Sequence, residues 1–427
     1  MTEISNRIKA LSQQQILILI FILAFAIRFA FLTTKPHAWT HKLQAGDEPI
    51  YHGIAVSLAR GEGYQFEGKP TARYGPGYPF FIAAVYRTLG ISPPAARVGN
   101  AFLGAILSVL IALWAVWIWG KKAGLVSGLA AAIYYPFVQL PPYLMTENLY
   151  LPLFIAAMMA TWRLSSQSSC GSVKSIDDRE KLKLFSAGAL WGMAALTRSI
   201  ALPIALLTSF WLLLKTNWRQ AGVLSAVFVA VLVPWTVRNY LVFNSFVPIQ
   251  LSAGHDFYLA FGPSGNEPKV LGHWNWGSDV SRPKIPEGLS PVERDKWLQK
   301  QAWEQIKADP MEAVINRIPR KLINLLSPFY GTASLPNKVL TTFFYIALIS
   351  LAVPSLVRSW RSENRSERNF VELVLLVALF TIVFHAIFYG VVRYRYPIDA
   401  LLLVAVGQSA LRWGKERLSS KEIFSNQ

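Results

Sequence analysis

The sequence predicts an all-α, polytopic membrane protein with about ten transmembrane helices. Of its 427 residues, 53% are hydrophobic and only 15% are charged, whereas a soluble domain carries about 25% charged residues. The mean hydropathy is +0.34, and apolar stretches recur along the whole chain. At about 1.5 Å per helical residue, these stretches are long enough to cross a hydrocarbon core of about 30 Å.

Ten apolar stretches are expected to cross the membrane, each ending at polar or charged residues. The stretch 184–214 is too long for one crossing, so we divide it near Thr197 and Arg198 into two short spans. The predicted spans are 14–34, 95–119, 123–138, 149–164, the two halves of 184–214, 221–235, 340–357, 370–389 and 397–411.

The formal net charge is +18, and many of the Lys and Arg residues gather in short connectors between apolar runs. These connectors fall on one face when the ten spans are threaded in order, and that face is predicted to be cytoplasmic. Both termini are then cytoplasmic, in a multi-pass protein of the cell (inner or plasma) membrane. Membrane topology therefore explains the positive charge, and we expect the lipid bilayer and no nucleic acid as a partner.

Two long segments, 35–94 and 236–337, are predicted on the extracytoplasmic face. Both mix charged residues with aromatic residues, glycine and proline, which is typical of functional loops rather than of disordered ones. We divide the chain into a transmembrane catalytic module, 1–235, which includes the first outer loop, the extracytoplasmic segment 236–337, and C-terminal helices with a cytoplasmic tail, 338–427. Any chemistry is expected on the extracytoplasmic side.

The first outer loop contains an acidic pair, Asp47 and Glu48, directly before a helical stretch at about 48–58. A second amphipathic stretch follows at 78–89, and both helices are expected to lie along the membrane surface. Asp47 is well placed to cap the first helix, which has Pro49 in its first turn. A carboxylate beside the membrane is also suited to act as a general base, so capping and catalysis both remain open.

Other polar and aromatic residues stand where loops meet predicted spans, and each has two interpretations. Arg73 could bind a phosphate through paired hydrogen bonds or contact lipid headgroups. Glu147 could belong to a site or simply start a helix. Arg28, inside the first span, must face the protein interior, either for a structural pairing or for a substrate. Trp274 and Trp276 could stack on a sugar ring or form part of an interfacial aromatic belt.

Three histidines of the first outer loop are candidate metal ligands. His37, His41 and His52 are spaced so that, with Glu48, they could bind a divalent metal. Histidines of solvated loops are commoner than metal ligands, so we expect no metal site and no required cofactor. The single cysteine, Cys170, excludes an intramolecular disulfide bond.

Seven sequence fragments follow one another in a specific order. They are "FAIRFAF", "GDE", "RYGPGYPF", "LMTENLYLPLF", "LTRSIALPI", "VPWTVRNYLVFNSFVPI" and "VVRYRYPID". Together they resemble the C-type (GT-C) integral-membrane glycosyltransferases of the protein O-mannosyltransferase and aminoarabinose-transferase superfamily, particularly its smaller bacterial members. The resemblance covers about residues 14–410 and is weakest in the outer segment after Trp235.

The resemblance implies transfer of one hexosyl or pentosyl group, with inversion, from a polyprenyl-phosphate donor to an extracytoplasmic lipid, glycan or protein acceptor. It assigns catalysis to Asp47, as the general base, and to its neighbour Glu48. The residues that it assigns to the donor phosphate are Arg73, Arg393, Arg395 and Tyr396, and those that it assigns to the cavity are Glu147, Arg198 and Arg238. These residue types suit the reaction, because the acceptor needs a base and the leaving phosphate needs positive charge.

Two other functions remain open at this stage. A non-enzymatic lipid or glycan transporter would carry its polar residues in mid-membrane and would show repeated halves, and we find no such repeat. A polymerase or ligase of surface polysaccharide would use a longer lipid-linked glycan and would have its main Arg-rich outer loop near the C-terminus. The acidic pair after the first span favours the glycosyltransferase.

Overall fold

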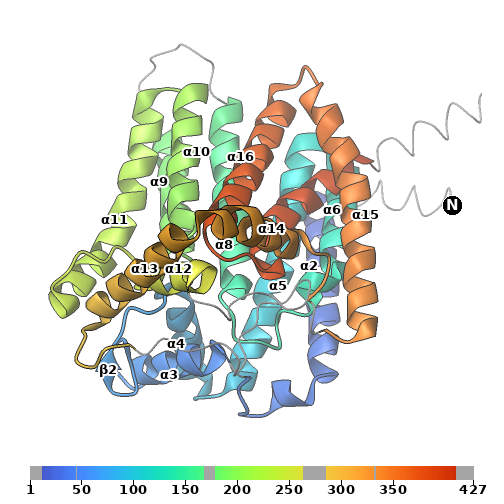
Figure 1. Cartoon of the computed structure of the whole chain (residues 1–427). Helices are drawn as coiled ribbons and strands as arrows, with labels where there is room; N and C mark the ends of the chain where they lie inside the picture. The colour runs from blue at the N-terminus through green and yellow to red at the C-terminus, as the bar shows by residue number, and fades with distance from the viewer. Residues whose placement is uncertain (1–11, 45, 168–177, 263–284, 331–332, 410–427) are drawn as a thin grey trace, which may run out of the picture.

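The computed structural model describes residues 12–44, 46–167, 178–262, 285–330 and 333–409. These residues are predominantly helical, and β1 (Gln65–Phe66) and β2 (Lys69–Pro70) form one short antiparallel hairpin. Figure 1 shows the long helices side by side in a bundle, with shorter helices lying across it. The all-α class predicted from the sequence is therefore confirmed.

The bundle is built from nine long helices and a helical C-terminal stretch within the described residues. They are α2 (Gln13–Thr33), α5 (Pro93–Trp119), α6 (Lys121–Ile133), α8 (Glu147–Gln167), α9 (Asp178–Thr197), α10 (Ala201–Lys215), α11 (Trp218–Phe243), α15 (Leu335–Trp360), α16 (Arg365–Ile387) and residues 396–409. Of these, α2, α5, α11, α15 and α16 are long and apolar enough to cross a membrane. The protein is thus a multi-pass membrane protein, while the count of ten crossings stays a prediction.

The predicted division of the apolar stretch 184–214 is confirmed by the helix boundaries. Helix α9 ends at Thr197, and α10 begins at Ala201. Gly188 and Gly192 on α9 lie against α11, where a Cβ atom would meet the side chains of valines on that helix. These glycines let α9 and α11 approach closely.

At two places the helices differ from the predicted spans because of proline. The span 123–138 is interrupted, because α6 stops at Ile133 and a separate turn, α7 (Tyr135–Val138), contains Pro136 in its first turn. Proline lacks the backbone N–H that a continuous helix requires, so it favours a new helix start. In contrast, α11 contains Pro234 and continues beyond 235, ending only where Asn244 adopts a left-handed conformation.

Arg28 has a structural role in the first span. Its side chain is fully buried, and its guanidinium donates hydrogen bonds to the backbone oxygens of Ala24, Ala131 and Ala132. The last two carbonyls lie at the end of α6, whose final carbonyl groups have no partner within their own helix. Arg28 therefore ties α2 to α6, and the structural interpretation of this residue replaces the substrate interpretation.

The first outer loop contains η1 (Pro36–Trp39) and the two helices expected from the sequence, α3 (Glu48–Ala59) and α4 (Gly77–Leu89). Tyr51 and Ala55 of α3 pack in one hydrophobic cluster with Tyr78 and Ile82 of α4. Figure 1 shows both helices beneath the bundle, with α3 running across its axis. This arrangement leaves the start of α3 at the edge of the bundle, facing the ends of the long helices.

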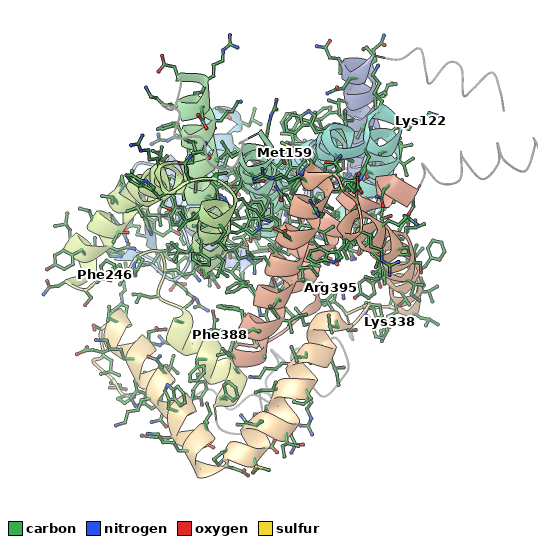
Figure 2. The ribbon with its side chains drawn as sticks, turned by 90° about the horizontal axis from the view of Figure 1, so that it is seen from above. Lys122, Met159, Phe246, Lys338, Phe388 and Arg395 are labelled. Atoms are coloured by element: carbon green, nitrogen blue, oxygen red, sulfur yellow. The ribbon has the colours of Figure 1, made fainter. Side chains whose placement is uncertain are left out.

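The described part of the outer segment contains three more helices and a π-helical turn. They are α12 (Ala253–Phe261), α13 (Pro291–Ala308), η2 (Glu312–Arg317) and α14 (Ile318–Leu326). Ser290 and Glu293 form a capping box that starts α13. Figure 2 shows α13 and α14 as the arms of a V that projects from the bundle. The predicted residues Cys170, Trp274 and Trp276 lie outside the described residues.

Candidate active site

A cavity of about 800 Å³ opens where the first outer loop meets the ends of the bundle helices. Its wall comes from the first outer loop, the turn before α8, the α9–α10 junction, α12, α13, the end of α16, and η3 (Val392–Arg395). The cavity brings together five of the residues that were assigned from the sequence. They are Asp47, Arg73, Glu147, Arg198 and Arg393.

Asp47 precedes α3, but it does not cap that helix through its side chain. One carboxylate oxygen, Oδ1, accepts a hydrogen bond of 2.7 Å from the Tyr74 hydroxyl. The other, Oδ2, accepts a hydrogen bond of 3.4 Å from Nη2 of Arg393. Asp47 thus occupies the N-cap position expected from the sequence, but its carboxylate is held by two partners on the cavity wall instead of capping the helix.

Tyr74 is a site residue that the sequence reasoning did not identify. Burial raises its pKa, and the nearby Asp47 carboxylate raises it further, so the phenol stays protonated and donates to Asp47. Gly75 and Gly77 follow it, and a Cβ at either position would collide with Leu196 or Thr197 at the end of α9. These glycines allow the loop to lie against α9, which brings Tyr74 to the cavity.

Glu147 and Arg198 form the inner part of the site. Oε1 of Glu147 lies 2.5 Å from Nη1 of Arg198 and 3.6 Å from Nε of Arg393. Together with the contact between Arg393 and Asp47, these pairs form a row of alternating charges, Asp47–Arg393–Glu147–Arg198. Buried charges must be paired to avoid a large desolvation cost, and this row pairs all four.

Arg393 contacts both carboxylates of the row, Asp47 and Glu147, and is positioned by the short helix η3. Burial alone would lower its pKa, but the neighbouring Tyr394, Glu147 and Asp47 raise it, so that the net pKa is above its usual value. Arg198 lies with its guanidinium carbon 4.9 Å from the ring centre of Tyr394. Both arginines therefore remain charged, with an aromatic ring and carboxylates to orient them.

Arg73 lies at the rim of the cavity and is exposed. Its guanidinium carbon is 5.6 Å from the ring centre of Tyr74. Among the described residues, no carboxylate forms an ion pair with Arg73.

Glu48 does not line the cavity, although it is adjacent to Asp47 in the sequence. It is buried, lies 3.5 Å from Nη2 of Arg97, and accepts hydrogen bonds from the backbone N–H groups of Gln44 and Leu144. These contacts tie the first outer loop to α5 and to the turn before α8. This geometry places Glu48 outside the cavity, among contacts that hold the fold together.

Three residues assigned from the resemblance do not reach the cavity either. Arg395 is buried, where it pairs with Asp399 at 3.0 Å and donates to the backbone oxygen of Ser327. Tyr396 is buried in the main core cluster. Arg238 donates to the backbone oxygens of Tyr64 and Thr71 and lines a neighbouring groove instead.

The candidate metal ligands do not form a cluster. His52 Nδ1 lies 2.8 Å from the hydroxyl of Tyr86, and the His37 ring lies beside Tyr143. The His41 side chain is exposed. Within the described ranges, no three His, Cys, Asp or Glu side chains gather where one metal ion could bind them.

The outer wall of the cavity comes from the extracytoplasmic segment 236–337, in which no helices were predicted from the sequence. The backbone N–H of Leu251 donates to the oxygen of Ala72, and that of Gly75 donates to the Gln250 side chain. Asp295 of α13 accepts hydrogen bonds from the N–H groups of Gly254 and His255 at the start of α12. These bonds join the first outer loop, α12 and α13 into one wall.

No protein-family model and no curated protein sequence matches this chain. Among solved structures it is similar to the archaeal oligosaccharyltransferase AglB from Archaeoglobus fulgidus in complex with an inhibitory peptide and a dolichol-phosphate. The identity is 15%, the TM-score is 0.59, and the match covers 97% of this chain and 51% of that one. The apo form of the Archaeoglobus fulgidus oligosaccharyltransferase matches with 13% identity and a TM-score of 0.56, covering 97% of this chain and 52% of that one.

ArnT from Cupriavidus metallidurans bound to undecaprenyl phosphate is also similar, with 14% identity and a TM-score of 0.47, covering 92% of this chain and 75% of that one. The present chain spans about half the length of the oligosaccharyltransferase. The similarity shows that this chain shares the fold of that oligosaccharyltransferase.

Proposed function

We propose that this protein transfers a single sugar, a hexosyl or pentosyl group, from a polyprenyl-phosphate donor to an acceptor on the extracytoplasmic face, with inversion. The observation that carries the proposal is the contact between Asp47 and Arg393 on the wall of a large cavity that also contains Arg198 and Arg73. Asp47 supplies a carboxylate, and Arg393, Arg198 and Arg73 supply guanidinium groups. Transfer from a phosphate requires both kinds of group.

In the proposed reaction, the acceptor hydroxyl attacks the anomeric carbon of the donor sugar. Its oxygen forms the new glycosidic bond, while Asp47 accepts the hydroxyl proton. The bond between the anomeric carbon and the phosphate oxygen breaks, and its electron pair leaves with the polyprenyl phosphate. Attack opposite to the leaving group inverts the configuration of the anomeric carbon.

The arginines stabilise the phosphate as it leaves. Polyprenyl phosphate gains negative charge when the bond between the anomeric carbon and the phosphate oxygen breaks. Fixed guanidinium groups stabilise that charge. Arg393 is the best placed of them, because it contacts the proposed base directly. Arg73, at the rim and without an ion-pair partner among the described residues, can contact the same phosphate as the donor enters.

The lipid chain of the donor needs an apolar surface next to the cavity. A groove of about 690 Å³ runs beside it and is lined by apolar side chains of α9 and α11, including Leu196, Val231, Trp235 and Val242. Pro70 lines both the groove and the cavity. The dolichol-phosphate in the similar oligosaccharyltransferase structure supports a lipid phosphate as the ligand of this fold.

Donor consumption tests this proposal. The purified protein in proteoliposomes is incubated with a panel of polyprenyl-phosphate sugars and with lipid, glycan and peptide acceptors, and release of polyprenyl phosphate is followed. We expect one donor to be consumed, faster with one acceptor class than without acceptor. Equal background release from every donor, with every acceptor class, would contradict a transferase.

A further inference from the structure

Tyr51 of α3 lines the cavity but has no part in the reaction described above. The residue is 5% exposed, and its ring packs against those of Tyr74 and Tyr78, with ring centres 4.7 Å and 5.5 Å away. Both neighbouring rings are themselves held by hydrogen bonds, which their hydroxyls donate to Asp47 and to Asn100. The Tyr51 ring is therefore fixed in place on the cavity wall.

The Tyr51 hydroxyl has no hydrogen-bond partner among the residues that the structure describes. Protein atoms do not enclose it either, in contrast to the hydroxyl of Tyr150, which is both enclosed and without a partner. Water can pair with the Tyr51 hydroxyl while the cavity is open to solvent. A ligand that displaces this water loses affinity unless it supplies a polar group of its own at the same position.

Other side chains hold the two carboxylates that lie near this hydroxyl. Oδ1 of Asp47 accepts a hydrogen bond from Tyr74, and Oδ2 accepts one from Arg393. Oε1 of Glu147 lies 2.5 Å from Nη1 of Arg198. The phenolic proton and the lone pairs of the hydroxyl are therefore left for a ligand in the cavity.

The charges around the hydroxyl favour a neutral ligand group over an anionic one. Burial raises the pKa of Tyr51 well above its ordinary value, Asp47 and Glu147 raise it further, and Arg198 lowers it by less than either carboxylate raises it. The phenol therefore stays protonated, and the carboxylates outweigh the guanidinium at this position. A phosphate oxygen would be repelled here, whereas a neutral hydroxyl, which both donates and accepts, matches the phenol.

We propose that the Tyr51 hydroxyl binds a hydroxyl group of the transferred sugar and thereby contributes to the selection of the donor. The inference rests on the proposed function, in which the anomeric carbon is attacked beside Asp47. Tyr51 lies one helical turn after that residue, and its backbone N–H donates to the Asp47 oxygen at 3.1 Å. Since the phosphate is assigned to the arginines, Tyr51 would contact the sugar and not the lipid carrier. A site that hydrogen-bonds a substrate hydroxyl discriminates strongly against a ligand that lacks it.

Binding of lipid probes tests the inference without turnover. Undecaprenyl phosphate and its hexosyl and pentosyl forms are titrated into the purified full-length protein in detergent micelles, and Kd is obtained from the rise in the unfolding midpoint with lipid concentration. Tyr51→Phe keeps the ring and removes only the hydroxyl. The matched control is Tyr78→Phe, because the buried hydroxyl of Tyr78 donates to Asn100 at 3.1 Å and Tyr78 does not line the cavity.

For the sugar-linked lipid that wild type binds most tightly, we expect Kd to rise about tenfold or more in Tyr51→Phe, with the Kd of undecaprenyl phosphate unchanged. Tyr78→Phe should bind both lipids as wild type does. Without lipid, Tyr78→Phe should unfold at a lower temperature than wild type, because Asn100 loses a partner, whereas Tyr51→Phe should not.

Equal Kd values of wild type and Tyr51→Phe for the sugar-linked lipid would overturn the inference and leave the proposed function standing. An equal loss of affinity for undecaprenyl phosphate would assign Tyr51 to the phosphate and would also overturn it. If none of these lipids stabilised wild type, the proposed function would fail, and this inference would fail with it.

Discussion

Asp47 and Arg393 are 346 positions apart in the sequence, and their side chains meet at 3.4 Å on the wall of the cavity. One comes from the start of α3 in the first outer loop, and the other comes from η3, just beyond the end of α16. Neither end of the chain can form this contact alone. The site therefore requires that the first outer loop and the last helices pack against the same bundle.

Replacing Arg393 with glutamine is expected to reduce kcat/KM for the consumed donor by about 100-fold or more, because a fixed donor to developing charge is lost. Arg393→Lys should retain part of the activity, since it keeps the charge but loses the paired hydrogen-bond geometry. Arg73→Gln, at the rim, should mainly raise KM. Steady-state kinetics on the three variants distinguishes these effects, and an Arg393→Gln protein with normal kcat/KM would contradict the role of this residue.

Tyr74→Phe removes the hydroxyl that donates to Asp47 and leaves the ring in place. The Asp47 carboxylate would lose a partner that orients it toward the acceptor, so we expect kcat to fall by about 10- to 100-fold. Steady-state kinetics on this variant and on wild type measures the effect, and an unchanged kcat would mean that Tyr74 does not orient the base.

Glu48→Gln separates structure from catalysis at the acidic pair. Glu48 and Arg97 have almost no exposed side-chain surface, and breaking a buried ion pair costs about 3 kcal/mol or more. We expect a lower thermal unfolding midpoint, with nearly normal donor turnover per folded molecule at low temperature. Normal stability together with lost turnover would instead restore Glu48 to the catalytic site.

Because the Lys321 side chain is buried, we expect the free energy of unfolding to depend on pH. Burial lowers its pKa to about 7, with a further lowering from Arg317, whereas the pKa of an unfolded lysine is about 10.4. Between these values the unfolded chain binds more protons, so the free energy of unfolding should rise from about pH 7 to pH 10.

Thermal unfolding of wild type and Lys321→Met across this pH range tests that expectation, with the exposed lysine variant Lys300→Met as the matched control. The Lys321→Met protein should lose the rise, and the control should keep it. A rise of equal size in all three proteins would assign the pH dependence to other groups.

Much of the architecture could be predicted because it depends on local patterns. The α9–α10 junction follows from a polar interruption at Thr197 and Arg198, and α3 and α4 follow from amphipathic runs with clear starts. The effects of two prolines could not be predicted from local patterns. The helix is interrupted at Pro136, whereas α11 continues through Pro234. Proline breaks one of these helices and is accommodated in the other, and tertiary packing decides which.

The site could be predicted only in part, because side-chain direction depends on the backbone geometry. Arg393 and Arg395 are two positions apart on a helix with about three residues per turn, so they point to different sides. Asp47 and Glu48 are adjacent and likewise diverge, one toward the cavity and the other toward Arg97. A motif reveals that such residues lie near one another, but not which of them faces the ligand.

The most direct test of the account compares Asp47→Asn with Asp178→Asn. Both change an aspartate to asparagine, but Asp178 is an exposed residue at the start of α9, outside the cavity. Both proteins and wild type are incubated in proteoliposomes with the donor that wild type consumes, and release of polyprenyl phosphate is followed. We predict at least about a 100-fold loss for Asp47→Asn and normal release for Asp178→Asn. Equal release by all three proteins would contradict Asp47 as the base.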